Sequence, residues 1–285
     1  MRSSSLVCEV AGAGLGPAVV LVHGVGVGPE AFGPLAELLV AAGHAVVTVH
    51  RPGYGRSPAR PAVSLDDQAD DLVAVLDHLR EADGDGPAAL VGVSGGATLA
   101  LLAAARLAHR PTPAGLAAPV PVVAHEPLVG PLAPSLHRRV ARAVADLASA
   151  EGGVPDVGER AVRFVRHLVG EATWSGLDPR VRAAVAERAD LVVAEALAFA
   201  GVAPTRADLD AVRRHGRLTT TVGVRSGRER WLAASTLASL AGAHVEGVPL
   251  AGHLAHVDAP PSFARLVLAA AVPAAVGVPA TGAPA

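Results

Sequence analysis

A serine in a glycine-rich turn is the residue of this chain best suited to chemistry. Ser94 lies within Val91-Gly92-Val93-Ser94-Gly95-Gly96, which has the spacing G-x-S-x-G. An apolar run precedes this stretch and a helix-forming run follows it, so the pattern predicts a strand, a sharp turn and a helix. There the serine would stand at the positive end of the helix, which favours a nucleophile that develops negative charge. The alternative is a tight turn whose serine only caps the helix.

A late histidine could supply the base that such a serine needs. A serine hydroxyl is a poor nucleophile at neutral pH unless an imidazole takes its proton. His253 follows Gly252 in the loop after the last expected strand. The alternative is a histidine in a surface loop. His256 is the nearest competing base, and we expect it to pack or cap instead.

The elements that position these residues follow from hydrophobic patterning. Continuous β-branched runs, typical of strands buried on both faces, alternate with amphipathic stretches typical of helices. This order predicts an α/β fold with a mostly parallel, doubly wound sheet, whose sites lie beyond the carboxyl ends of the strands. The expected strands are Leu6 to Val10, Pro17 to Val22, Ala45 to Val49, Ala88 to Val91, Val120 to Ala124, Arg217 to Gly223 and Ala243 to Val248.

The pattern changes between residues 128 and 215. This stretch is helical in character, richer in charge, and has no buried-strand run. We therefore expect a core domain formed by residues 1–127 and 216–285, with residues 128–215 inserted as a helical lid. Residues 272–285 are rich in proline, glycine and alanine, and are expected to form a frayed tail of the core domain.

Composition and charge narrow the function classes. The chain has 285 residues and a net charge of −2, which gives no electrostatic reason to bind nucleic acid or an anionic membrane. The one cysteine, Cys8, excludes an intrachain disulfide and suits a reducing cytoplasm. The sequence has no signal-peptide pattern, membrane-spanning run, metal-ligand cluster or phosphate-binding glycine motif. We expect a bacterial, cytoplasmic monomer or homodimer that acts on a small molecule without cofactor or metal.

The order of these features resembles the α/β-hydrolase fold superfamily from about Val19 to Val267. The resemblance rests on the His23-Gly24 loop, the G-x-S-x-G turn, the position of the expected lid and the late Gly-His pair. It implies a lidded, esterase- or lipase-like enzyme with a serine nucleophile, in which His23 is structural. It also implies an oxyanion hole formed by the backbone N–H groups of Val25 and Gly95.

The acid of the expected triad is where the chain departs from the family. The usual acid follows the strand Leu218 to Val222 in a Gly-x-x-Asp pattern, which here reads Gly223-Val224-Arg225-Ser226. A second position, known in some members, carries Glu126 after the preceding strand, where a carboxylate could reach His253. Glu126 could instead cap the lid junction or pair with an arginine. Glu229 is the fallback acid, and a dyad without acid is a third option.

These features together predict a serine hydrolase that cleaves an ester, thioester or lactone bond of a small to medium apolar substrate through an acyl-enzyme. Because fold does not determine function, two alternatives stay open. One is a specialised or non-hydrolytic enzyme of a natural-product pathway, such as a cyclase, acyltransferase, perhydrolase or carbon–carbon hydrolase. His50, where many relatives have aspartate, makes such a role plausible. The other is a ligand-binding protein on a hydrolase scaffold. The sequence assigns no substrate-binding residue.

Overall fold

A seven-stranded sheet forms the centre of the computed structural model, which describes residues 6–83, 86–110, 120–149, 156–215 and 217–271. The strands are β1 (Val7–Ala11), β2 (Gly16–Val22), β3 (His44–His50), β4 (Ala89–Val93), β5 (Val122–His125), β6 (Leu218–Gly223) and β7 (His244–Val248). Their order across the sheet is β1-β3-β2-β4-β5-β6-β7. β1 pairs antiparallel with β3, and every other neighbouring pair is parallel. The expected α/β fold with a mostly parallel sheet is therefore confirmed, and the strand ends agree with expectation to within two residues.

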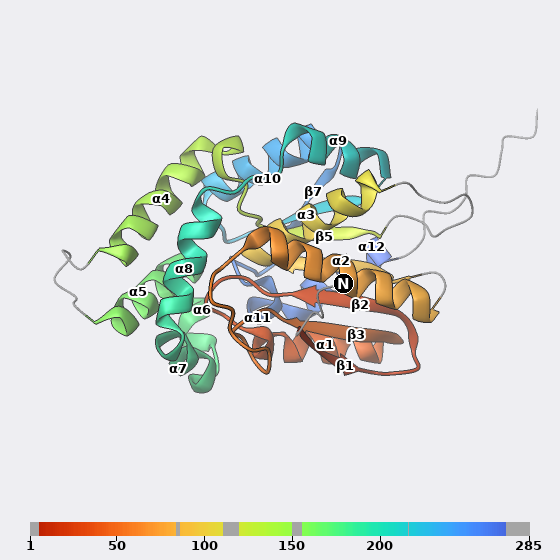
Figure 1. The fold of residues 1–285 in the computed structure, drawn as a ribbon, viewed down its shortest axis with the longest axis horizontal. Coiled ribbons are helices and arrows are strands. Elements are labelled where there is room, and N and C mark those ends of the chain that lie inside the picture. The colour runs from red at the N-terminus through yellow and green to blue at the C-terminus, as the bar shows by residue number, and fades with distance from the viewer. Residues whose placement is uncertain (1–5, 84–85, 111–119, 150–155, 216, 272–285) are drawn as a thin grey trace, which may run out of the picture.

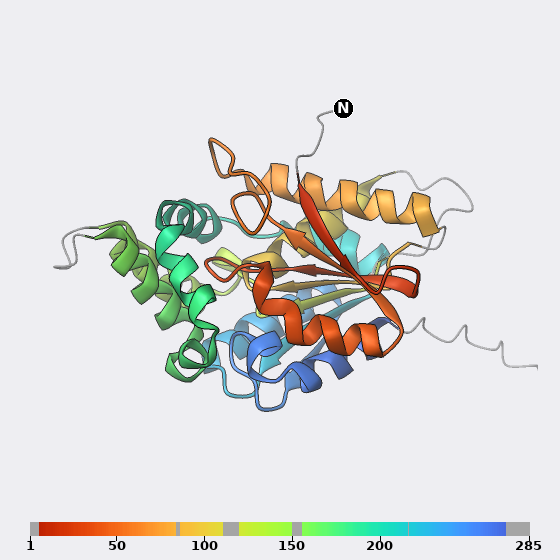
Figure 2. The same cartoon turned by 90° about the horizontal axis from the view of Figure 1, so that it is seen from below.

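Helices cover both faces of this sheet (Figures 1 and 2). Six α-helices and one short 3-10 helix lie before β5 or after β6 in the described part of the chain. They are η1 (Pro29–Phe32), α1 (Gly33–Ala41), α2 (Leu65–Asp83), α3 (Gly95–His109), α10 (Arg228–Ala241), α11 (Ala255–Asp258) and α12 (Pro260–Ala271). α2 and α3 pack together on one face, and α1 and α12 pack together on the other. This layering is that of a doubly wound sheet.

β2 shows how the sheet divides the core. Val19 and Leu21 belong to the cluster shared with α1 and α12, whereas Val20 and Val22 belong to the cluster shared with α2 and α3. Successive side chains of a strand point to opposite faces, so a strand covered on both sides needs an unbroken apolar run. All four side chains are fully buried. Burial on both faces of the sheet therefore explains why Val19 to Val22 form an unbroken apolar run.

Helices also fill the chain between β5 and β6. They are η2 (Gly130–Leu132), α4 (Pro134–Ala148), α5 (Val157–Val169), α6 (Glu171–Gly176), α7 (Pro179–Glu187), α8 (Ala189–Ala200) and α9 (Arg206–His215). α4, α5, α7 and α8 pack against one another at one end of the sheet, whereas α9 packs against α3 and α10 (Figure 1). We call α4 to α8 the helical insertion. No strand occurs in the described part of the chain between β5 and β6.

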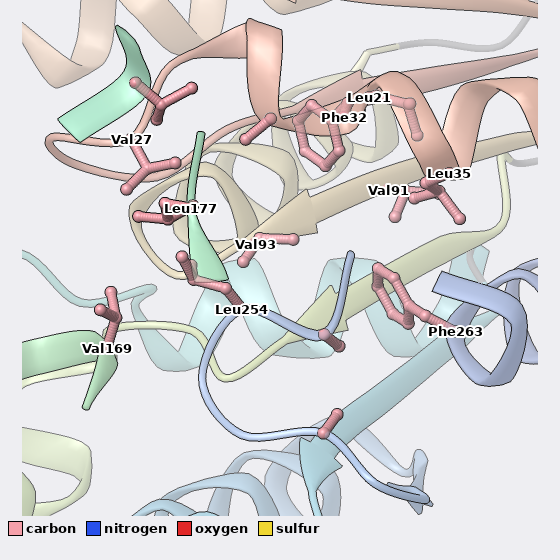
Figure 3. Close-up of a cluster of buried hydrophobic side chains, with 14 of the residues drawn as sticks. Leu21, Val27, Phe32, Leu35, Val91, Val93, Val169, Leu177, Leu254 and Phe263 are labelled. Carbon is pink, nitrogen blue, oxygen red and sulfur yellow. The ribbon is translucent and has the colours of Figure 1, made fainter. Parts of the chain in front are cut away.

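The helical insertion shares a buried apolar cluster with the sheet (Figure 3). Val169 and Leu177 of the insertion lie in the same cluster as Val27, Val93 and Leu254, which come from loops and strand ends of the core. Burial of apolar surface stabilises by roughly 25 cal/mol per Å², so this packing holds the insertion over the carboxyl ends of the strands. That is the edge where the sequence predicts the site.

The expected tail, residues 272–285, lies outside the described residues. Within the part that is described, no helix combines the length and the apolar character that crossing a bilayer requires.

Candidate active site

Ser94 stands on a strained turn between β4 and α3. Its backbone has φ 55° and ψ −121°, a conformation that L residues rarely adopt. The turn is so tight that a Cβ on Gly92 would lie 2.5 Å from Ala97 Cα, and a Cβ on Gly96 would lie 2.5 Å from His23 O. Only glycine fits at both positions. The Ser94 side chain makes no capping hydrogen bond to α3. The turn therefore presents the hydroxyl at the sheet edge instead of using it as a helix cap.

Three side chains from distant parts of the chain form one hydrogen-bonded line. His253 Nε2 lies 3.1 Å from Ser94 Oγ, and His253 Nδ1 lies 2.7 Å from Glu126 Oε2. With its proton on Nδ1, the imidazole donates to Glu126 and accepts from the Ser94 hydroxyl. Ser94, His253 and Glu126 are 6%, 5% and 2% exposed, so bulk water screens their interactions little. The arrangement has the nucleophile–base–orienting group geometry of nucleophilic catalysis.

Glu126 reaches His253 because the slot of the usual acid accommodates its carboxylate. Glu126 directly follows β5 with φ 47°, and its Oε1 accepts hydrogen bonds from Gly223 N at 3.0 Å and from the Ser226 hydroxyl. Arg230 Nε lies 3.2 Å from Glu126 Oε2. A carboxylate at position 226 would repel Glu126, whereas a hydroxyl donates to it. The serine in the acid's slot is therefore the partner of the carboxylate that occupies this space.

Glu229, the second candidate acid, lies elsewhere. Its Oε2 is 3.8 Å from Arg139 Nη1, and its side chain is 39% exposed. Glu126, by contrast, has no exposed side-chain surface. The structure thus brings Glu126 to His253 and leaves Glu229 in an ion pair at the surface, which is worth little in water.

The surrounding charges determine the protonation state of this line. Burial would raise the pKa of Glu126, but the hydrogen bond from His253 and the charge of Arg230 outweigh it, so this pKa lies well below its usual range. Burial, followed by the charge of Arg230, lowers the pKa of His253 to about 4 against the opposing effect of Glu126. At neutral pH the carboxylate is therefore ionised and the imidazole neutral. This is the state that a general base needs.

The loop after β2, residues 23–28, lies directly against Ser94. A Cβ on Gly24 would be 3.0 Å from Ser94 Cβ. Val25 follows in this loop and lines the same small cavity as Ser94, and Gly95, the first residue of α3, directly follows Ser94 in the chain. Both residues expected to supply the oxyanion hole are therefore next to Ser94. His23 is fully buried, its Nδ1 donates to Gly24 O at 2.9 Å, and burial lowers its pKa well below the usual range. This neutral imidazole supports the loop, as expected for a structural residue.

A small cavity adjoins Ser94 beneath the helical insertion. Its volume is about 10 Å³, enough for about one water molecule. His253 and His256 line it from the core, and Val165, Leu168 and Val169 of α5 cover it. A larger cleft of about 210 Å³ reaches His253 between α4, the end of α5 and the loop after β6. A substrate at Ser94 therefore requires the side chains of α5 to move.

His256 is the unusual polar group of this cavity. It is 1% exposed, and neither ring nitrogen has a hydrogen-bond partner among the described residues. Its ring packs on Phe32, with the centroids 4.4 Å apart. Burial, followed by the neighbouring His125 and His253, lowers its pKa to about 3, so it is neutral. It packs as expected, but it keeps an unused donor and acceptor beside Ser94.

Sequence reasoning did not single out Arg230 or the buried pair formed by Arg51 and Glu195. The sequence contains one signal for Glu195, because it is a lone carboxylate in the otherwise apolar stretch Leu191 to Phe199. Charged residues are rarely fully buried without a partner, so such a position predicts an ion pair. Arg230 carries no comparable signal, since it lies among polar residues at the start of α10.

A parallel sheet that carries a strained serine turn at its carboxyl edge defines a class of α/β enzyme folds. Within that class, the sequence pattern of the alpha/beta hydrolase family matches residues 19–266. The chain belongs to this family.

Two solved structures illustrate the likeness of fold. The enol-lactonase from Burkholderia xenovorans LB400 is 18% identical, with 93% of this chain and 95% of that one covered and a TM-score of 0.68. A thermophilic esterase from Thermogutta terrifontis is 21% identical, with 93% and 92% covered and a TM-score of 0.64. At these identities the likeness concerns the fold alone.

One relative is more similar in sequence over a shorter stretch. The polyketide synthase ThaQ of Burkholderia thailandensis is 38% identical over 96 residues, which make up 34% of this chain and 4% of that protein. The matched part is thus a small fraction of the relative's length.

Proposed function

We propose that this protein is a serine hydrolase that cleaves an ester, thioester or lactone bond through an acyl-enzyme. The observation that carries the proposal is the hydrogen-bonded line from Ser94 through His253 to Glu126 at the carboxyl edge of the sheet. The esterase and the enol-lactonase that share its fold support the choice of ester and lactone bonds.

The proposed reaction has two halves. Ser94 Oγ attacks the carbonyl carbon while His253 Nε2 takes the hydroxyl proton, and the backbone N–H groups of Val25 and Gly95 stabilise the oxyanion. Collapse of the tetrahedral intermediate breaks the bond to the leaving group, which receives the proton from His253. Water then gives a proton to His253 and attacks the acyl-enzyme, which releases the acid and restores Ser94.

Glu126 is the proposed acid of the triad. An ionised carboxylate 2.7 Å from Nδ1 holds the imidazole in the tautomer that leaves Nε2 free to accept the serine proton. It also stabilises the imidazolium that forms in each half reaction. Because its pKa lies well below the usual range, Glu126 stays ionised across the working pH of a hydrolase.

We propose that the helical insertion forms the body of a lid, residues 128–215, inserted into a core domain of residues 1–127 and 216–285. The valine and leucine side chains of α5 over Ser94 favour an apolar substrate. His256 would meet a hydroxyl or carbonyl group close to the scissile bond. We also propose that the protein acts on a small molecule, is cytoplasmic and is a monomer or homodimer.

The stretch shared with a polyketide synthase favours a second candidate function. The same triad would then act on a thioester in a natural-product pathway, with either water or a hydroxyl of the substrate as the acceptor of the acyl group. Product analysis separates the two functions. Hydrolysis of a hydroxyacyl thioester gives the free acid, whereas cyclisation gives a lactone.

Turnover of p-nitrophenyl acetate and butyrate by the wild type and Ser94→Ala tests the proposal. We expect Ser94→Ala to lower kcat by roughly 10⁴-fold or more, since it removes the atom that forms the acyl-enzyme. Circular dichroism and the thermal midpoint control for folding. Equal rates for the two proteins would exclude Ser94 as the nucleophile for these esters.

A further inference from the structure

A fully buried polar cluster joins the helical insertion to the core below it. Glu195 of α8 is 0% exposed, and Arg51 and Tyr54 of the loop after β3 are 1% and 0% exposed. Arg51 Nη2 donates to Glu195 Oε1, and the Tyr54 hydroxyl donates to Glu195 Oε2 at 2.6 Å. The one carboxylate of the cluster therefore holds two side chains of the core at once.

Those two side chains also hold the loop that contains Val25. Arg51 Nη1 donates to Gly24 O at 2.8 Å, and the Tyr54 hydroxyl accepts from Gly26 N at 2.9 Å. The peptide units on both sides of Val25 are thus hydrogen-bonded to partners of Glu195.

The bond to Gly24 O has a direct effect on the proposed oxyanion hole. Gly24 C=O and Val25 N–H belong to the same peptide unit, which is planar and trans, so the two groups point in opposite directions. Arg51 Nη1 and His23 Nδ1 both donate to this carbonyl, and by fixing its direction they fix the direction of the N–H as well. A cationic donor at the carbonyl also polarises this peptide and strengthens its N–H as a donor.

The second oxyanion residue also contacts α8. A Cβ on Gly95 would lie 2.9 Å from Phe199 Cζ, so the Phe199 ring packs against the start of α3. Glu195 and Phe199 are one helical turn apart, and therefore share a face of α8. One face of one helix of the insertion thus contacts Gly95 directly and is linked through Arg51 and Tyr54 to the peptide units on both sides of Val25.

We propose that Glu195 is a positioning residue that orients the Val25 N–H through Arg51 and Tyr54, so that the oxyanion hole is complete only while the insertion is docked. This inference rests on the proposed hydrolase function. A buried guanidinium without its carboxylate is strongly unfavourable. Departure of α8 would therefore draw Arg51 toward water and away from Gly24 O. Docking of the insertion and assembly of the oxyanion hole become one event, and a site left open to water is catalytically weak.

Glu195→Gln tests this role, with Glu30→Gln as the matched control. Glu30 Oε1 lies 3.3 Å from Arg188 Nη1, so the control also removes an ion pair between insertion and core, but one that does not contact Gly24 or Gly26. With p-nitrophenyl butyrate we expect Glu195→Gln to lower kcat about 10- to 100-fold while KM stays within about two-fold. A trifluoromethyl ketone analogue of the ester should bind more weakly by the same factor. Glu30→Gln should stay within about two-fold of the wild type.

Amide hydrogen exchange gives a readout that does not depend on turnover. We expect faster exchange in residues 24–26 of Glu195→Gln, and unchanged exchange there in Glu30→Gln. If Glu195→Gln does not fold, Tyr54→Phe, which removes the acceptor for Gly26 N, is measured in the same way. A kcat and an exchange rate equal to those of Glu30→Gln would overturn the positioning role. Absence of turnover in the wild type would overturn the hydrolase proposal instead, while exchange still decides the role of Glu195.

Discussion

Two buried carboxylate–arginine pairs contact residues next to Ser94, and the two pairs differ in what surrounds them. Glu126 is paired with Arg230 at the end of β5, and Glu195 is paired with Arg51 beneath α8. Burial raises the pKa of Glu195, and Arg51 and Tyr54 only partly oppose this effect. Burial acts on Glu126 in the same direction, yet its pKa is lowered, because His253 and Arg230 together outweigh it.

The difference shows that the neighbours of a buried carboxylate, not burial itself, determine its use. Glu126 accepts from a titratable imidazole, which in turn faces a hydroxyl. Glu195 accepts from a guanidinium, which stays protonated, and from a phenol whose pKa burial raises well above the usual range. The first carboxylate stays ionised and is therefore suited to orient an imidazole that transfers a proton, whereas the second is suited to holding structure in place.

Glu126→Gln should have the largest effect on activity. An amide at this place holds the imidazole without stabilising the imidazolium, so we expect kcat to fall about 10³- to 10⁴-fold with little change in KM. The rate of p-nitrophenyl butyrate hydrolysis measures this loss. Glu229→Gln, which removes the carboxylate that sequence analysis left as the fallback, should stay within about two-fold. Similar losses of kcat in both variants would contradict the assignment of Glu126, and not Glu229, as the acid of the triad.

Arg51→Met should have the largest effect on folding. It leaves Glu195 buried without its cation, and we expect it to lower the free energy of unfolding by about 3–5 kcal/mol. The double variant Arg51→Met/Glu195→Met removes both charges and should recover most of that loss. Urea denaturation measures both. A double variant as unstable as the single one would mean that the pair does not act as a buried ion pair.

The pH dependence of kcat/KM should show how the charge of Arg230 affects the pKa of His253. The base must be neutral, so activity is lost as pH falls through the pKa of His253, which is about 4. The charge of Arg230 lowers this pKa. Arg230→Gln should therefore move the acid limb of the profile to higher pH. The profile is measured between pH 3.5 and 8 on protein shown to stay folded. A limb that moves to lower pH would contradict the proposed electrostatics.

Ser226 should give the smallest effect. Ser226→Ala removes one of several donors to Glu126, so we expect a loss of about three-fold in kcat. Ser226→Asp in a Glu126→Gln background places a carboxylate in the family's usual slot. We expect it to recover about ten-fold of the lost activity, measured against Glu126→Gln alone. No recovery would show that the slot no longer directs a carboxylate to His253.

The sequence alone determined the sheet, the serine turn and the place of the helical insertion. These features depend on local patterns, such as the buried run Val19 to Val22 and the glycines around Ser94, because backbone sterics and strand periodicity act over a few residues. Sequence also limited the acid to a short set of candidates.

Only the tertiary structure places Glu126 beside His253 and Glu229 in an ion pair with Arg139, and only it reveals the second buried pair. Glu126 and His253 are 127 residues apart in the chain, and Tyr54 and Glu195 are 141 residues apart. Whether such groups meet depends on how β5, β6 and β7 pair and how α8 docks, which no local pattern encodes. The pKa of each carboxylate followed from that packing, since charges and hydrogen bonds act through space and not along the chain.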